Sequence, residues 1–151
     1  MKKAELLAPA GNMEALIAAV QAGCDAVYLG LNSFSARAFA GNFSREELVE
    51  AVRYCHIRGV KVYVTMNTIL YEPEIKAAKD QIQFLYDHDV DALLIQDFGL
   101  FHYVRTCFPD FEVHCSTQMH IHNMSGIEYM KTQGVKRVVL ARETPIELVE
   151  K

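Results

Sequence analysis

The stretch that decides the fold is VKVYVTMNTILYEPEIKAAKDQIQFLYDHDVDALLIQD, residues 60–97. It opens and closes with short apolar runs typical of buried strands, Val60–Met66 and Ala92–Ile95. The segment between them carries apolar residues at helical spacing, namely Ile75, Ala78, Ile82 and Leu85. A strand, a helix and a second strand without a hairpin signal predict two parallel strands joined by a right-handed crossover.

The same alternation continues towards both ends of the chain. Four further strands are predicted, at Glu5–Leu7, Ala26–Leu29, Glu112–Thr117 and Arg137–Ala141. Ser44 and Glu47 form a capping box where the helix before the third strand should begin. A glycine that can end a helix in the left-handed conformation precedes three of the strands, at Gly23, Gly59 and Gly134. The sequence therefore predicts an α/β protein with about six parallel strands and intervening helices.

Two parallel architectures fit this pattern, an open doubly wound sheet and a (β/α)8 barrel. The first strand is followed by Ala8-Pro9-Ala10-Gly11-Asn12, not by the G-x-G-x-x-G turn of a nucleotide-binding sheet. A barrel predicts polar side chains at the carboxyl ends of its strands. The last four predicted strands carry such residues: Asn67, Gln96, Asp97, His114, Ser116, Gln118, Arg142 and Glu143. We therefore favour a partial TIM-type (β/α)8 barrel.

Composition is that of a single domain, residues 1–151, with 51% hydrophobic and 23% charged residues. The net charge of −4 argues against a bulk electrostatic grip on nucleic acid. No apolar run approaches the roughly 18 residues of a spanning helix, and the N-terminus does not resemble a signal peptide, so we expect a cytoplasmic protein without a membrane partner. Four cysteines without a C-x-x-C pair are predicted to be buried and unreactive: Cys24, Cys55, Cys107 and Cys115.

A closed barrel needs about eight strands, so about six leave it incomplete. Thr144-Pro145-Ile146-Glu147 has the pattern of a helix start, with an N-cap Thr and Pro in the first turn. Because only Leu148–Lys151 follow, we expect this chain to be the N-terminal portion of a longer protein. The first and sixth strands would then have unpaired edges, which predicts self-association or a missing C-terminal half.

Seven segments in order carry a resemblance that extends over residues 5–151: ELLAPAGN, AVYLG, FSARAFAGNF, VYVTMNT, LLIQDFG, HCSTQM and RVVLARE. They resemble the N-terminal half of the collagenase-like peptidases, peptidase family U32. Several members of that family hydroxylate transfer RNA, ribosomal RNA or a quinone precursor. The resemblance implies a barrel, an iron–sulfur cluster and, for the transfer-RNA members, prephenate as oxygen donor. It places the cluster cysteines beyond residue 151, so we expect no cofactor within this chain.

Three residues are candidates for catalysis: Asp97, His114 and Glu143. His114 would either point into the barrel mouth or be a satisfied interior histidine. Asp97 and Glu143 would either form an acid–base pair or bind Arg142 or Arg37 as salt bridges. His120 and His122 have a spacing that could hold zinc, but no third ligand lies nearby in the sequence, so we predict no metal site.

Six residues are candidates for binding a substrate: Arg37, Asn67, Gln96, Ser116, Gln118 and Arg142. Arg37 lies in the long loop Leu31–Phe43, where it could clamp a carboxylate or phosphate while phenylalanines stack on a base. Ser116 lacks the G-x-S-x-G context of a nucleophile.

Three functions remain open. The first is a family enzyme named as a peptidase that acts in RNA hydroxylation in its full-length form. The second is a genuine metal- or carboxylate-assisted peptidase, and the third a non-catalytic small subunit that presents its barrel mouth to a partner. RNA or peptide is the expected substrate, and this chain alone is expected to be inactive.

Overall fold

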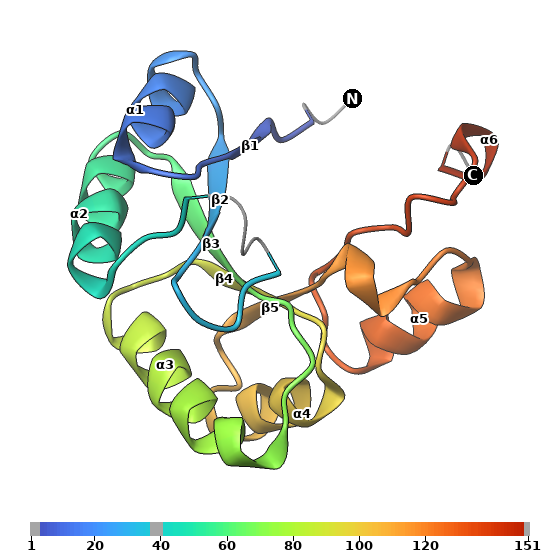
Figure 1. The fold of residues 1–151 in the computed structure, drawn as a ribbon. Helices are drawn as coiled ribbons and strands as arrows, with labels where there is room; N and C mark the ends of the chain where they lie inside the picture. Colours follow the sequence, from blue (N-terminus) through green and yellow to red (C-terminus); the bar gives the residue numbers. More distant parts are fainter. Residues whose placement is uncertain (1–3, 37–40, 150–151) are drawn as a thin grey trace.

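The computed structural model describes residues 4–36 and 41–149. A six-stranded parallel sheet in the order β1-β2-β3-β4-β5-β6 curves around one side of the molecule (Figure 1). Its strands are β1 (Leu7–Pro9), β2 (Ala26–Gly30), β3 (Lys61–Met66), β4 (Ala92–Ile95), β5 (Glu112–Cys115) and β6 (Arg137–Val138). Each strand pairs in parallel with the next one along the chain. The predicted partial barrel is therefore confirmed.

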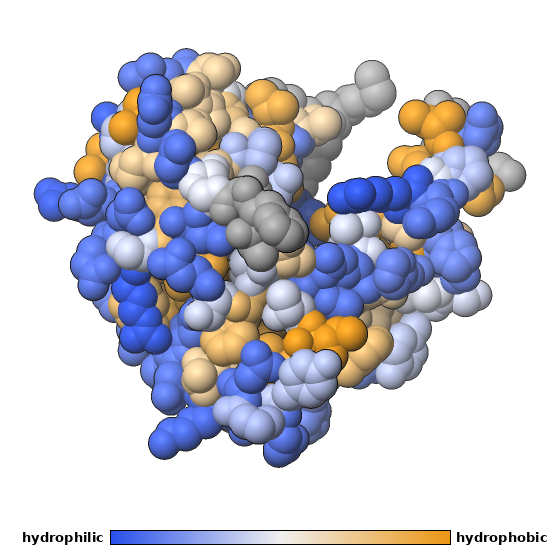
Figure 2. Space-filling model, viewed as in Figure 1, coloured by the Kyte–Doolittle hydropathy of each residue, from blue (hydrophilic) through white to orange (hydrophobic). Residues whose placement is uncertain are grey.

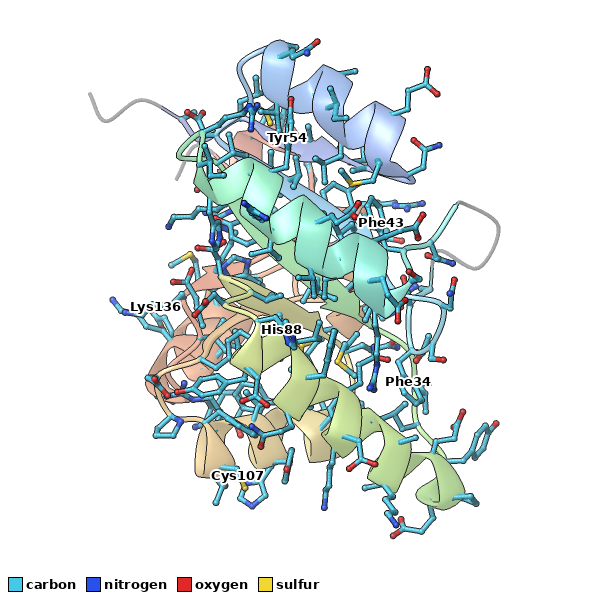
Figure 3. All side chains as sticks on the ribbon, turned by 90° about the vertical axis from the view of Figure 1, so that its left-hand side faces the viewer. Phe34, Phe43, Tyr54, His88, Cys107 and Lys136 are labelled. Atoms are coloured by element: carbon cyan, nitrogen blue, oxygen red, sulfur yellow. The ribbon has the colours of Figure 1, made fainter. Side chains whose placement is uncertain are left out.

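Helices follow the strands and cover the convex side of the sheet (Figure 3). They are α1 (Met13–Gln21), α2 (Arg45–His56), α3 (Ile75–Asp87), α4 (Phe98–Cys107), α5 (Met124–Thr132) and α6 (Ile146–Val149), with the short 3-10 turns η1 (Glu72–Glu74) and η2 (Thr117–Met119). None of the helices within the described ranges is long and apolar enough to cross a bilayer.

Local sequence signals explain several helix ends. The Ser44 hydroxyl accepts a hydrogen bond from the Glu47 backbone N–H at 3.1 Å, and the Glu47 carboxylate accepts one from the Ser44 backbone N–H at 2.7 Å. This confirms the predicted capping box at the start of α2. The glycines predicted to end helices have positive φ angles: Gly23 88°, Gly59 70° and Gly134 81°. Added side chains would be strained in this conformation, which explains the glycines.

Several element boundaries differ from the prediction. The first strand is Leu7–Pro9, two residues later than predicted, and the sixth ends its ladder at Val138. The fifth strand ends at Cys115 because the Ser116 hydroxyl accepts a hydrogen bond from the Gln118 N–H and starts η2. At the C-terminal helix, α6 begins at Ile146, and the buried Thr144 hydroxyl has no hydrogen-bond partner. The predicted Thr144 cap was therefore wrong.

The main core lies between the convex side of the sheet and the helices, with fully buried side chains such as Leu16, Leu48 and Ile82. Three cysteines are buried as predicted, and burial raises the pKa of Cys55 to about 12 and that of Cys115 to about 11. Cys107 is exposed, so the prediction of four buried cysteines was wrong there. The helical pattern that suggested burial ends at Cys107, the last residue of α4.

Aspartates hold the amino ends of the strands in register. The Asp25 carboxylate, just before β2, accepts a hydrogen bond from the Leu6 backbone N–H at 2.7 Å. The Asp91 carboxylate, just before β4, accepts one from the Val62 N–H at 2.7 Å and contacts His56 Nε2 at 2.8 Å. Each aspartate thus ties its own strand to the strand that precedes it along the chain. These contacts leave the carboxyl ends of the strands to form the mouth of the half-barrel.

Candidate binding site at the mouth of the half-barrel

A pocket of about 420 Å³ opens on the concave face at the carboxyl ends of the strands. Its polar wall contains four of the residues predicted to bind a substrate: Asn67, Ser116, Gln118 and Arg142. Apolar side chains from β4 and the β6 segment, Leu94 and Val139, line it as well. The structure thus brings together side chains that follow three different strands. That they contact a substrate stays a prediction.

Asn67 forms hydrogen bonds that join two parts of the wall of this pocket, which we call the mouth pocket. Its Oδ1 accepts a hydrogen bond from the Ala36 backbone N–H at 3.0 Å, and its Nδ2 donates to the Ser116 hydroxyl at 3.3 Å. The side chain at the end of β3 therefore connects the β2–α2 loop to the end of β5.

A hydrogen bond between two buried hydroxyl groups also holds the β2–α2 loop in place. The Thr65 hydroxyl donates to the Leu29 carbonyl at 3.1 Å, so in the 2.8 Å contact between Ser35 and Thr65 the Ser35 hydroxyl is the donor. Gly30 makes this approach possible, because a Cβ atom there would collide with the Ser35 hydroxyl. The β2–α2 loop therefore passes very close to the end of β2. Arg37, the loop residue predicted to bind a substrate, lies outside the described residues.

Arg142 is exposed and borders two pockets. The second, of about 250 Å³, is lined by Thr117, Gln118, His120, Arg142 and Glu143. His120 has φ 55° and ψ 33°, a left-handed conformation that costs a non-glycine residue on the order of 1 kcal/mol or more. The sequence suggests His120 only as a metal ligand and does not indicate its place beside Arg142. Its backbone conformation has no signal in the sequence beyond a modest preference of His for this region.

Asp97 caps a helix in the structure, and its catalytic role stays a prediction. Its Oδ1 accepts a hydrogen bond from the Leu100 N–H at 2.8 Å and caps α4, while Oδ2 accepts one from the Leu70 N–H at 3.4 Å. Neither Asp97 nor Gln96 lines the mouth pocket, whereas Glu143 lines the smaller neighbouring one. The structure therefore does not bring the predicted pair of Asp97 and Glu143 together.

His114 faces the concave side, as the strand alternation predicts, but it is directed away from the mouth. Only 1% of it is exposed, and Nε2 lies 2.8 Å from the Glu112 carboxylate, two residues nearer the amino end of β5. Burial lowers the pKa of His114, so the neutral ring donates from Nε2–H to Glu112. Its ring also packs against Tyr63 edge-on at 4.8 Å. The alternative of a satisfied interior histidine fits this arrangement.

These groups belong to a cross-sheet network of Glu5, Tyr63, Glu112, His114 and Arg137. Arg137 Nη1 contacts Glu5 Oε1 at 2.6 Å, although the two residues stand 132 positions apart and flank opposite edges of the sheet. The Tyr63 hydroxyl donates to both Glu5 oxygens, at 3.2 and 3.1 Å. The hydrogen bond from Arg137 lowers the pKa of Glu5, and burial raises that of Tyr63 to about 12. The network links the segment just before β1 to β3, β5 and β6 on the concave face.

Nothing in the described part of the chain assembles three or more His, Cys, Asp or Glu side chains that could hold a metal ion. His122 Nδ1 lies 3.1 Å from the backbone carbonyl of His120. Burial raises the thiol pKa of Cys24, Cys55 and Cys115, which disfavours the thiolate form that an iron–sulfur cluster requires. The residues present do not fit such a cluster, and ligands beyond residue 151 stay a prediction.

Residues 11–151 match the sequence model of peptidase family U32. The chain is 40% identical to "tRNA hydroxylation protein P1" of Bacillus subtilis, over 95% of this chain and 34% of that protein. It is 37% identical to "23S rRNA 5-hydroxycytidine C2501 synthase" of Escherichia coli (96% and 22% covered) and 34% identical to "Collagenase" of Porphyromonas gingivalis (96% and 34%). The chain thus spans about a third or less of the length of these relatives.

The fold also resembles a solved structure, that of the U32 peptidase Mk0906. The TM-score is 0.70 at 13% sequence identity, and the match covers 93% of this chain and 61% of that one. At this identity the similarity supports the α/β half-barrel fold alone.

Proposed function

The chain belongs to peptidase family U32, and from that premise we propose that it supplies the substrate-binding mouth of an enzyme that hydroxylates RNA. The names of two relatives, a tRNA hydroxylation protein and an rRNA 5-hydroxycytidine synthase, support RNA as the substrate class. An RNA substrate would place the protein in the cytoplasm.

The chemistry of the mouth pocket is the observation that carries this proposal. Among the described residues its lining contains hydroxyl and amide side chains, the guanidinium of Arg142, and no carboxylate. A guanidinium can bind a phosphate with two parallel hydrogen bonds, and Gln118 offers both a donor and an acceptor for a base edge. A volume of about 420 Å³ is within the usual range for pockets that bind small molecules or a single base.

The same geometry gives no support to a serine peptidase. The Ser116 hydroxyl accepts hydrogen bonds from Asn67 Nδ2 and the Gln118 N–H, each at 3.3 Å. The neighbouring imidazole, His114, is bonded to Glu112 instead. A nucleophilic serine requires a base within hydrogen-bond reach, and the described part of the site shows no such pair.

Within this proposal, the chain's residues bind and orient the RNA while the redox chemistry comes from groups outside it. Arg142 would hold a phosphate at the rim, and Gln118 would align the base. Asn67 acts indirectly, since both ends of its amide are already bonded to the loop and to Ser116.

The test uses bacteria that lack their own tRNA and rRNA hydroxylation genes and express the gene that encodes this sequence. Mass spectrometry of nucleosides from total RNA should show a nucleoside that is heavier by one oxygen. Arg142→Met should lower its yield by about tenfold or more, because a hydrogen bond to a charged group contributes roughly 1.5–3 kcal/mol. Arg53→Met, an exposed change on α2, is the matched control. Unmodified RNA together with gelatin cleavage by the purified protein would overturn the proposal in favour of a peptidase.

A further inference from the structure

Gln81 is a polar residue on the buried face of α3, and only 6% of it is exposed. The other buried residues of this helix are apolar: Ala78, Ile82 and Leu85. Hydrophilic side chains are prominent on the outer side of the helix (Figure 2). Burying an amide side chain costs free energy unless it forms hydrogen bonds, so Gln81 on this face is expected to have a specific partner.

That partner lies in the β2–α2 loop. Nε2 of Gln81 donates a hydrogen bond to the Ser33 backbone carbonyl at 3.3 Å, although the two residues are 48 positions apart. The next residue of the loop, Phe34, has φ 63°, a left-handed conformation that is unfavourable for a bulky side chain. Figure 3 shows Phe34 beside α3. The hydrogen bond from Gln81 therefore holds the loop directly before its strained residue.

Residues 33–36 of this loop have open space on their outer side. A pocket of about 240 Å³ lies there, and Ser33, Phe34 and Gln81 are among the residues that line it. Ala36 lines the mouth pocket instead. The loop thus separates two pockets, and the space on its outer side would let the strained residue relax away from the mouth if the hydrogen bonds of the loop were lost.

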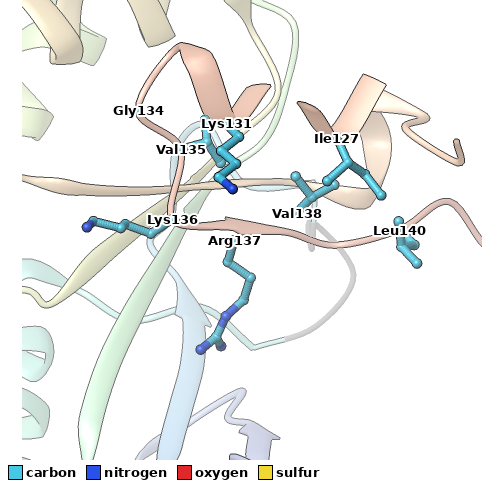
Figure 4. Close-up of a pocket in the computed structure, with 8 residues that line it drawn as sticks. All are labelled: Ile127, Lys131, Gly134, Val135, Lys136, Arg137, Val138 and Leu140. Atoms are coloured by element: carbon cyan, nitrogen blue, oxygen red, sulfur yellow. The ribbon is translucent and has the colours of Figure 1, made fainter. Parts of the chain in front are cut away.

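The hydrogen bonds of this loop lead from α3 to the mouth. The Ala36 N–H, three residues after Ser33, donates to the Asn67 side-chain oxygen at 3.0 Å, and Asn67 donates to the Ser116 hydroxyl at 3.3 Å. The hydroxyl contact of Ser35 lies between these two attachment points. A larger pocket, of about 560 Å³ between α5 and β6, is lined by none of these residues (Figure 4). A displacement at Ser33 would therefore reach the mouth pocket and leave the α5–β6 region unaltered.

We propose that Gln81 is a positioning residue for the mouth pocket: it holds the β2–α2 loop in its strained conformation, and the loop in turn orients the Asn67 amide. This inference rests on the proposed function, because it gives Gln81 a role in shaping the pocket that binds RNA. Gln81 does not line that pocket and acts through the backbone of residues 33–36. The site is thus ordered before a substrate arrives, which lowers the entropic cost of binding.

Hydrogen exchange followed by NMR tests this role without a measurement of activity. Gln81→Met removes the amide and keeps the length of the side chain, so the Ala36 amide should exchange about threefold to tenfold faster, the usual effect of losing one neutral hydrogen bond. The amides of β4 and α5 should keep their wild-type rates to within about twofold, because the loop opens locally. Gln83→Met is the matched control on the exposed side of α3, where Gln83 binds Asp87 of the same helix, and it should leave the Ala36 rate unaltered.

A second variant tests the strain itself. Glycine adopts the left-handed conformation at little cost, so in a Phe34→Gly background the change Gln81→Met should accelerate Ala36 exchange by less than about twofold. In the cellular assay described above, Gln81→Met should lower the yield of hydroxylated nucleoside at least about threefold, whereas Gln83→Met should not.

The inference is wrong if Gln81→Met accelerates all amides equally, because Gln81 then stabilises the whole fold and not the loop. An Ala36 amide that exchanges at the wild-type rate in Gln81→Met would contradict it as well, and so would a wild-type yield of hydroxylated nucleoside. If the wild-type protein itself makes no such nucleoside, the proposed function fails, and the exchange rates still decide whether Gln81 positions the mouth pocket.

Discussion

The contact between Glu5 and Arg137 provides the sharpest test of how the curved sheet is held. We would replace Glu5 by Gln, Arg137 by Met, and both together, and measure unfolding in urea at pH 7. Both side chains are partly exposed, at 28% and 34%, and the distance between their charged atoms is 2.6 Å. The Tyr63 hydroxyl binds the same carboxylate.

The expected coupling energy follows from this partial burial. Fully exposed ion pairs contribute about 0.2–1 kcal/mol, whereas hydrogen bonds to charged groups contribute about 1.5–3 kcal/mol. For a pair about a third exposed we expect an intermediate coupling of about 1–2 kcal/mol in the double-mutant cycle. Arg137→Met alone should lower the melting temperature by roughly 2–8 °C, given about 2–4 °C per kcal/mol for a chain of this size.

Lowering the pH should remove the contribution of this ion pair to the free energy of unfolding. Because Arg137 lowers the pKa of Glu5 in the folded state, the unfolded chain binds a proton at this site more readily. The contribution is therefore present above the unfolded pKa of about 4.3 and is lost as pH falls through the lower folded value. Lys76→Met, an exposed change on α3, is the control. A coupling energy below about 0.3 kcal/mol at pH 7 would refute the claim that this pair braces the sheet, since it equals the error of additivity.

Two further predictions concern the concave face. Gly30→Ala should destabilise the fold by about 1–3 kcal/mol in urea unfolding, because the new methyl group collides with the Ser35 hydroxyl. A change under about 0.5 kcal/mol would show that the loop moves aside. Wild-type stability should fall as the pH drops below about 6.5, because burial lowers the folded pKa of His114 and the unfolded chain takes up the proton first. In His114→Gln this part of the pH dependence should disappear, and its persistence would assign it to another group.

The mouth residues could be predicted because parallel strands place their carboxyl ends at one edge of the sheet. That geometry alone brings Asn67, Ser116 and Arg142 into one pocket. That Asp97 caps α4 could not be predicted from the sequence, because a carboxylate between a strand and a helix can serve as a cap or as an acid. The choice depends on which backbone N–H groups lie nearby.

It was harder to predict whether a side chain on the concave face turns towards the amino ends or the carboxyl ends of the strands. Alternation placed His114 correctly on the concave face but did not show that it turns towards Glu112 rather than towards Ser116. The contact between Glu5 and Arg137 had no signal at all, because it joins residues far apart in the chain and depends on how strongly the sheet curves. Both depend on tertiary geometry that local patterns do not encode.

The hydrogen bonds at the mouth divide its residues into two groups with different roles. The Asn67 side-chain oxygen accepts a hydrogen bond from the Ala36 N–H, and its Nδ2 donates to Ser116. Asn67 thus connects the end of β3 to the β2–α2 loop and to the end of β5, and it has little hydrogen-bonding capacity left for a ligand. Arg142 is exposed, and Gln118 uses only its backbone N–H in the contact with Ser116. We therefore expect selectivity for a substrate to depend on the segments that follow β5 and β6, and the segments that follow β2 and β3 to hold the pocket in shape. Variation at positions 118 and 142 should alter which ligand binds, and variation at position 67 should loosen the whole mouth.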